Sequence, residues 1–68
     1  MNNFCTNLKK YRLMTGRTQK EMAQLLDMTP NAYQKYELGT REPRLNTVIE
    51  IADILGISLD LLIKGELS

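Results

Sequence analysis

Four glycines divide this sequence into segments of helix length. Gly16, Gly39, Gly56 and Gly65 each follow a run in which apolar residues recur every three or four positions, and this is where glycine commonly ends an α-helix. The β-branched residues are few and never alternate with polar ones over the length of a strand. We therefore expect an all-α fold, a compact bundle of short helices around one core.

The starts of the helices are marked as well. Thr18 stands three residues before Glu21, which is the spacing of a capping box. Thr29 precedes Pro30, a residue that suits the first position of a helix because no N–H is needed there. Ser58 can cap a last short helix. These signals predict five helices, at about residues 4–15, 19–26, 30–38, 45–55 and 59–64.

The apolar positions of the five segments form the expected core. Asp27 ends the second segment, and aspartate tolerates the left-handed conformation that a sharp turn between helices often needs. Lys9, Lys10 and Arg12 stand between the apolar positions of the first segment. The expected core residues are Phe4, Leu8, Tyr11, Met22, Ala23, Leu25, Leu26, Tyr33, Tyr36, Leu45, Val48, Ile51, Ala52, Leu55, Leu59, Leu62 and Ile63.

Composition narrows the class of protein. The chain has 68 residues, of which 43% are hydrophobic and 25% charged, which is typical of one folded domain. Cys5 is the only cysteine and there is no histidine, so an internal disulfide and a zinc site of the usual kind are excluded. Neither an export signal nor an apolar run of about 20 residues is present. We expect a cytoplasmic domain, residues 1–68, without metal, cofactor or membrane contact.

The charges are distributed unevenly although the net charge is only +1. Residues 1–44 contain eight Lys and Arg against four Asp and Glu, whereas residues 45–68 contain one Lys against four Asp and Glu. This asymmetry favours a basic surface for phosphates and an acidic part that faces away from them. The alternative is that the charges are simply scattered over a solvated surface.

The segments at residues 19–26 and 30–38 are separated by a tight break, as in a helix-turn-helix. Four motifs carry a resemblance to a known family. They are Leu8, Tyr11 and Arg12 before Gly16, then TQKEMA at 18–23, KYELGTREP at 35–43 and ADILGISLDLL at 52–62. With these motifs, the chain resembles the Xre or Cro/repressor-type helix-turn-helix family of bacterial and phage transcription regulators.

The resemblance implies a lambda-repressor-like DNA-binding domain of five helices, with the helix-turn-helix at its second and third helices. It also implies that Arg12 pairs with Glu37 and that this pair is structural. The sequence departs from the family pattern at Asp27, where glycine is common, and at Arg17, where an apolar residue is usual. It departs again at Pro30, where many relatives have a polar side chain that reaches the bases.

The start of the third helix holds the candidates for base recognition. Asn31 suits adenine because its amide offers a donor and an acceptor together, Lys35 suits the two acceptors of guanine, and Pro30 suits a thymine methyl group. The alternative is that these side chains belong to an ordinary solvated helix surface. The candidate base-reading residues are Thr29, Pro30, Asn31, Gln34 and Lys35.

Other polar residues are candidates for contacts to DNA phosphates. Gln19 opens the second helix, where free backbone N–H groups favour an anion, and the resemblance implies a phosphate contact there. For Arg44, the resemblance suggests a place near the minor groove, and a solvated loop position is the alternative. The remaining candidates, which flank the two helices, are Lys9, Lys10, Arg17, Lys20, Thr40 and Arg41.

The function predicted in this way is a sequence-specific DNA-binding transcriptional regulator, a small repressor that binds an inverted repeat as a homodimer. Two half-sites increase both affinity and specificity. The dimer surface is expected in the C-terminal part, at Ile54, Ile57, Leu61, Ile63 or Leu67, unless these residues simply complete the core.

A protein-interaction module is the alternative function, such as the antitoxin of a toxin pair or an antagonist of another regulator. An enzyme is not expected, because the sequence lacks histidine, a partner for Cys5 and a glycine-rich phosphate loop. No small-molecule ligand is expected either.

Overall fold

The computed structural model describes residues 3–65, which form five α-helices and contain no strand. They are α1 (Phe4–Thr15), α2 (Gln19–Leu25), α3 (Pro30–Leu38), α4 (Leu45–Leu55) and α5 (Leu59–Lys64). The predicted all-α class is therefore confirmed, and each helix begins and ends within one residue of its expected bounds.

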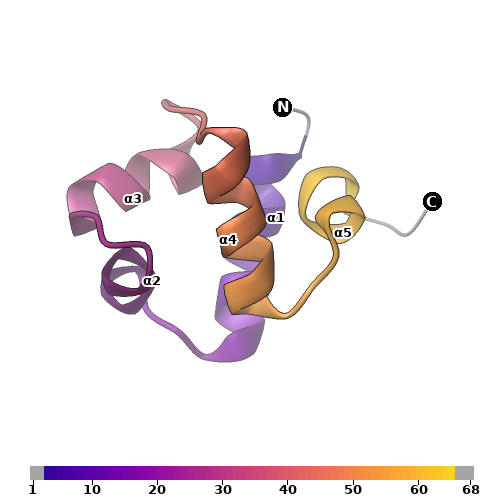
Figure 1. The fold of residues 1–68 in the computed structure, drawn as a ribbon, viewed down its shortest axis with the longest axis horizontal. Coiled ribbons are helices and arrows are strands. Elements are labelled where there is room, and N and C mark those ends of the chain that lie inside the picture. The colour runs from indigo at the N-terminus through magenta and orange to yellow at the C-terminus, as the bar shows by residue number, and fades with distance from the viewer. Residues whose placement is uncertain (1–2, 66–68) are drawn as a thin grey trace.

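Helix α1 is the centre of the bundle, because it contacts α3, α4 and α5. Helix α2 packs mainly on α3. Figure 1 shows α4 crossing in front of α1, with the α2 and α3 pair on one side of the molecule and α5 on the other. The helix pair and the last helix are therefore held apart by the two helices between them.

The predicted caps are present. The Thr18 hydroxyl oxygen accepts from the Glu21 N–H at 3.1 Å, and the Glu21 carboxylate accepts from the Thr18 N–H at 2.8 Å, which completes the capping box. Thr29 and Ser58 each accept from the backbone N–H three residues further on, at 3.1 Å. Each cap stabilises its helix by about 1 kcal/mol, which is substantial for such short helices.

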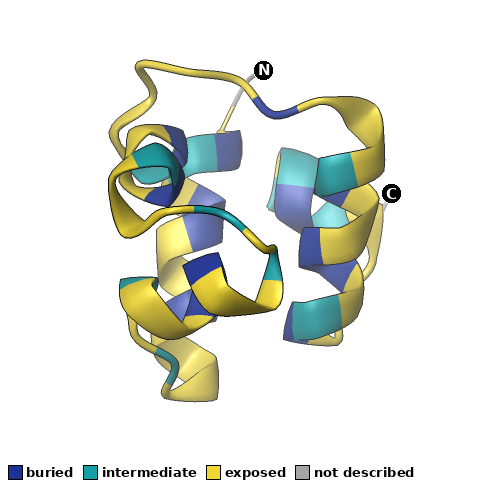
Figure 2. Ribbon diagram, turned by 60° about the vertical axis from the view of Figure 1, so that its left-hand side comes forward, coloured by how far each residue is buried: buried dark blue, intermediate teal, exposed yellow. Residues whose placement is uncertain are grey.

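The core forms where the inner sides of the helices meet, as Figure 2 shows by the position of the buried residues. Most of the expected core residues are buried or pack against the core. Among the residues named for a dimer surface, Ile54, Ile57 and Ile63 also pack against it, Leu61 is half-buried, and Leu67 lies outside the described residues. The buried apolar residues are Phe4, Leu8, Met22, Ala23, Tyr33, Tyr36, Val48, Ile51, Ala52, Leu55 and Leu62.

Three of the core predictions are wrong. Leu25 is 52% exposed, Leu45 is 68% exposed and Leu59 is 37% exposed. Leu25 is the last residue of α2 and lies at the edge of its buried side, about 60° around the helix from Met22 but about 160° from Ala23, because each helical residue turns the chain by about 100°. Leu45 and Leu59 are the first residues of α4 and α5, and each directly follows an exposed cap residue.

Two buried residues were not expected from the sequence, Asn7 and Pro43. The Asn7 amide nitrogen donates to the backbone carbonyl of Leu62 at 3.1 Å. Gly65 lies so close that a Cβ atom there would be 3.1 Å from the Asn7 Oδ1 atom. Asn7 therefore fixes the end of α5 against α1.

The turn between α2 and α3 contains Asp27, which has a φ of 56° and is the only non-glycine residue with a positive φ in the part of the chain described. The turn is closed by a hydrogen bond of 2.9 Å from the Met28 N–H to the Ala23 carbonyl. The sequence prediction of a left-handed aspartate at this position is confirmed.

We expect Asp27→Gly to raise the free energy of unfolding by up to about 1 kcal/mol, because glycine adopts this conformation without steric cost. Asp27→Ala should lower the stability. Thermal unfolding followed by circular dichroism measures both. Asp53→Gly is the control: Asp53 is exposed in the last turn of α4 and has a helical conformation, so glycine there should cost up to roughly 0.5 to 1 kcal/mol. If Asp27→Gly melts at a lower temperature than the wild type, the left-handed conformation of Asp27 does not cost stability.

Candidate nucleic-acid interface

Helices α2 and α3 form a unit whose connection is short and well anchored. Leu26 and Met28 are half-buried and pack against the core from within the connection, and Thr29 caps α3. The N-terminal end of α3 is thereby held at a defined position relative to α2, which is the geometry of a helix-turn-helix.

Helix α3 has two contrasting sides. Its inner side carries Tyr33 and Tyr36, whose rings are 6.3 Å apart and nearly perpendicular. Its outer side is exposed. All five candidate base-reading residues are exposed on this helix or at its cap, namely Thr29, Pro30, Asn31, Gln34 and Lys35.

The inner side of the unit is organised by the carboxylate of Glu37. Oε2 accepts hydrogen bonds from Arg12 Nε at 2.6 Å and from the Tyr33 hydroxyl at 2.5 Å. Oε1 accepts from Arg12 Nη2 at 3.1 Å and from Gln19 Nε2 at 3.0 Å. We call these four residues the Glu37 cluster. Because its members come from α1, α2 and α3, the cluster joins three helices.

The electrostatics of the Glu37 cluster keep the carboxylate charged. Its side chain is only 3% exposed, and that of Arg12 is 9% exposed. Burial raises the pKa of Glu37, but the hydrogen bonds from Arg12, Tyr33 and Gln19 outweigh it, so that the pKa lies below its usual value. Burial also raises the pKa of Tyr33, whose hydroxyl therefore stays protonated and donates.

Arg12 also reaches the segment between α1 and α2. Its Nη1 atom donates to the backbone carbonyl of Arg17 at 2.9 Å. The hydrogen bond to Glu37 raises the pKa of Arg12, which keeps the guanidinium charged. The same side chain thus fixes the entry into α2 and the end of α3.

The phosphate candidates occupy several elements. Gln19 is half-buried because its amide nitrogen binds Glu37, and the Thr40 hydroxyl donates to the Lys35 carbonyl at 3.4 Å. The Lys10 ammonium lies 5.3 Å from the centre of the Tyr11 ring. Arg17 is half-buried, and the candidates that are exposed are Lys9, Lys10, Lys20, Thr40, Arg41 and Arg44.

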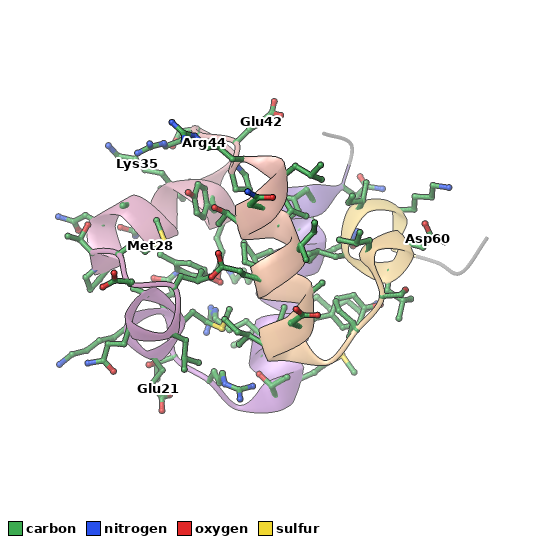
Figure 3. The ribbon with its side chains drawn as sticks, viewed as in Figure 1. Glu21, Met28, Lys35, Glu42, Arg44 and Asp60 are labelled. Carbon is green, nitrogen blue, oxygen red and sulfur yellow. The ribbon has the colours of Figure 1, made fainter. Side chains whose placement is uncertain are left out.

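Figure 3 shows where two of the basic candidates, Lys35 and Arg44, lie relative to three acidic side chains. Lys35 and Arg44 project towards the same edge of the molecule, although Glu42 also lies near that edge. Glu21 points away at the opposite edge, and Asp60 lies on the far side, at α5. The basic side chains at the end of α3 and the start of α4 are thus remote from the acidic residue on α5.

The sequence did not reveal how Tyr33 and Gln19 are used inside the unit. Tyr33 was expected only as a core residue, but its hydroxyl also donates to Glu37. Tyr33 and Glu37 are four residues apart, a spacing that places two helical side chains on the same side of a helix. This spacing was the sequence signal that could have predicted their contact. The contact from Gln19 spans 18 residues and had no such signal.

Residues 3–65 contain no group of three His, Cys, Asp or Glu side chains that could hold a metal ion. The described helices are also all too short or too polar to cross a membrane. Within the same residues, every buried side-chain nitrogen or oxygen has a hydrogen-bond partner. The polar groups left for a ligand are therefore on the surface.

The fold and the arrangement of α2 and α3 agree with comparisons to known proteins. The family model HTH_3, described as helix-turn-helix, matches residues 8–62. The chain belongs to this helix-turn-helix family. The resemblance inferred from the four motifs is thereby confirmed, and so is the expectation that the domain is not an enzyme, since the family is one of transcription regulators.

Individual relatives of this helix-turn-helix domain are regulators. The uncharacterized HTH-type transcriptional regulator YqaE of Bacillus subtilis is 52% identical over 63 residues, which cover 93% of this chain and 54% of the relative. The cryptic phage CTXphi transcriptional repressor RstR of Vibrio cholerae is 36% identical over 53 residues, which cover 78% of this chain and 47% of the relative. The chain thus spans about half the length of these relatives.

A solved structure has the same fold. It is the crystal structure of a transcriptional regulator from Listeria innocua, with a TM-score of 0.83 and 25% sequence identity. The match covers 96% of this chain and 60% of the other.

Proposed function

We propose that residues 1–68 form one DNA-binding domain of a transcription regulator, which inserts the outer side of α3 into the major groove. The observation that carries this proposal is the exposed polar side of α3 at residues 29–35, held by a capped helix start and a rigid inner side. A helix presented in this way fits the major groove, which is wide enough for it.

Two side chains on α3 read bases in this proposal. Asn31 and Lys35 are four residues apart and lie one turn apart on the same side of the helix. Asn31 forms two hydrogen bonds with adenine, and Lys35 binds the acceptors of guanine. Pro30 contacts a thymine methyl group, and Thr29 and Gln34 complete the contact surface.

The phosphate contacts position the domain without reading sequence. Gln19 donates to a phosphate from the start of α2. The positively charged contacts come from the flanking residues, and the acidic C-terminal part faces away from the DNA. The proposed phosphate-contacting residues are Gln19, Lys9, Lys10, Arg17, Lys20, Thr40, Arg41 and Arg44.

The domain acts as a homodimer and a repressor in this proposal, in the bacterial cytoplasm where its DNA is. Two α3 helices about 34 Å apart reach successive half-sites of an inverted repeat. In this proposal the partner subunit covers the exposed large apolar side chains of the C-terminal part, Leu45, Ile49 and Leu59. The relative named as a transcriptional repressor supports the sign of regulation.

Selection of duplexes from a randomised pool tests the proposed function. We expect an inverted repeat to be enriched and to bind more tightly than random DNA. The logarithm of the affinity should fall with the logarithm of salt concentration, with a slope of about 0.9 per phosphate neutralised. If no duplex binds better than random DNA, the proposal is overturned and a protein-interaction module becomes the favoured function.

We expect Asn31→Ala and Lys35→Ala each to lower the affinity for the selected site by about 1 to 3 kcal/mol and to relax the preference at particular base pairs. Binding of duplexes with single base changes, measured by fluorescence anisotropy, tests this. Asn46→Ala and Lys64→Ala make the same chemical changes on exposed positions of α4 and α5 and should leave the base preference unchanged. A uniform loss over all duplexes would contradict base reading by α3.

A further inference from the structure

The contact between Gln19 and Glu37 fixes the orientation of the Gln19 amide group. An amide nitrogen has two hydrogens, and one of them is donated to Glu37 Oε1 at 3.0 Å. The reverse orientation would place the amide oxygen against the carboxylate oxygen, which are two acceptors without a hydrogen between them. Gln19 is only half-buried, so its second N–H is left for a group outside the protein.

The Glu37 carboxylate is itself held on both oxygens. Each oxygen accepts one hydrogen bond from Arg12, and the second one comes from Tyr33 on Oε2 and from Gln19 on Oε1. The position of the carboxylate is thus defined by two nitrogens of the planar Arg12 guanidinium and by the hydroxyl of Tyr33, whose ring is fully buried. Its position in turn determines where Gln19 points.

We propose that Tyr33 and Glu37 are positioning residues for the DNA-phosphate contact of Gln19. Glu37 takes one hydrogen of the Gln19 amide, the other donates to a phosphate oxygen, and Tyr33 holds the carboxylate in the place that makes both possible. This inference rests on the proposed function, since it requires that the domain binds DNA. According to this proposal, Tyr33 and Glu37 of α3 affect the affinity for DNA although neither residue contacts the DNA.

The substitution that tests Tyr33 is Tyr33→Phe. It keeps the buried ring and its packing on Tyr36 but removes the donor to Glu37 Oε2. We expect the affinity for the selected duplex to fall about fivefold, the loss of one hydrogen bond. The base preference and the salt slope should not change, because a neutral donor releases no counterions. Tyr36→Phe, which removes a hydroxyl outside the Glu37 cluster, is the matched control.

A double-mutant cycle separates positioning from a merely structural role. In a Gln19→Ala protein, Tyr33→Phe should change the affinity less than twofold, since the contact it positions is already absent. Duplexes with a single methylphosphonate should identify one phosphate whose replacement weakens the wild type but neither variant. An equal loss from Tyr33→Phe with and without Gln19, or no loss at all, would overturn the proposal.

A measurement on the wild type avoids any dependence on the folding of a variant. In nuclear magnetic resonance spectra of the free protein, one Gln19 Nε2 hydrogen should be protected from exchange. On addition of the selected duplex the other hydrogen should shift while the first stays protected. Loss of the first protection would overturn the proposal. If instead no duplex binds the wild type, the proposed function fails, and the free-protein spectrum still tests the contact to Glu37.

Discussion

Leu62→Ala is expected to lower the free energy of unfolding by about 2 to 5 kcal/mol, because the cavity left by a buried leucine is only partly refilled. Leu62 is 0% exposed and is the only buried residue among those described in α5. A domain of this size has a total stability of roughly 3 to 10 kcal/mol. The substitution should therefore remove a large fraction of the total stability.

Urea denaturation followed by circular dichroism measures this loss. Leu59→Ala is the matched control, since it is the same chemical change three residues earlier in α5, at a partly exposed position. It should cost less than about 1 kcal/mol. Equal losses for the two variants would mean that α5 does not contribute its buried side chain to the common core.

Arg12→Met is expected to lower the stability by about 3 kcal/mol, since it leaves the buried Glu37 carboxylate without its cation. The arginine provides two of the four hydrogen bonds to Glu37 and one to the Arg17 carbonyl. Denaturation at neutral pH measures the loss. Arg41→Met, at an exposed position, should change the stability by less than about 0.5 kcal/mol.

The double variant Arg12→Met with Glu37→Gln tests whether the stability lost in Arg12→Met comes mainly from the unpaired charge of Glu37. If most of the loss comes from the stranded charge, the double variant should be more stable than Arg12→Met alone. If the double variant is the less stable of the two, the stranded charge is not the main cost, because both variants lack the hydrogen bonds of Arg12.

The pH dependence of the wild type provides a check on the same pair. The pKa of Glu37 in the folded state lies below its usual value of 4.5, so the stabilisation is complete above about pH 4.5 and is lost as the pH falls through the folded-state pKa. Glu37→Gln should lose less stability over this acidic range than the wild type does. Parallel stability curves would contradict the lowered pKa.

The sequence was most informative where structure depends on neighbouring residues. The caps at Thr18, Thr29 and Ser58 and the left-handed Asp27 involve contacts within five residues, so their signals lie within short segments. Burial was predicted less well, because periodicity gives the direction of a side chain but not whether another helix covers it. Leu25 is the example, since it belongs to an apolar run and yet faces solvent.

The candidate interface divides in the same way. The exposed side of α3 followed from its two tyrosines and its cap, since one helix determines which residues lie opposite its buried side. The Glu37 cluster did not follow from spacing. Its ion pair was implied by the family resemblance, and the contacts of Tyr33 and Gln19 to the same carboxylate came only from the structure.

By itself, the sequence determined the five helices and their ends, because caps, glycines and helical periodicity act over a few residues. The family followed from the resemblance carried by the four motifs. The tertiary structure alone decided which apolar residues are covered and which donors share the Glu37 carboxylate. Arg12, Gln19 and Glu37 are separated by 18 to 25 residues where they touch. Contacts over such separations depend on how α1, α2 and α3 pack, and local sequence does not contain that packing.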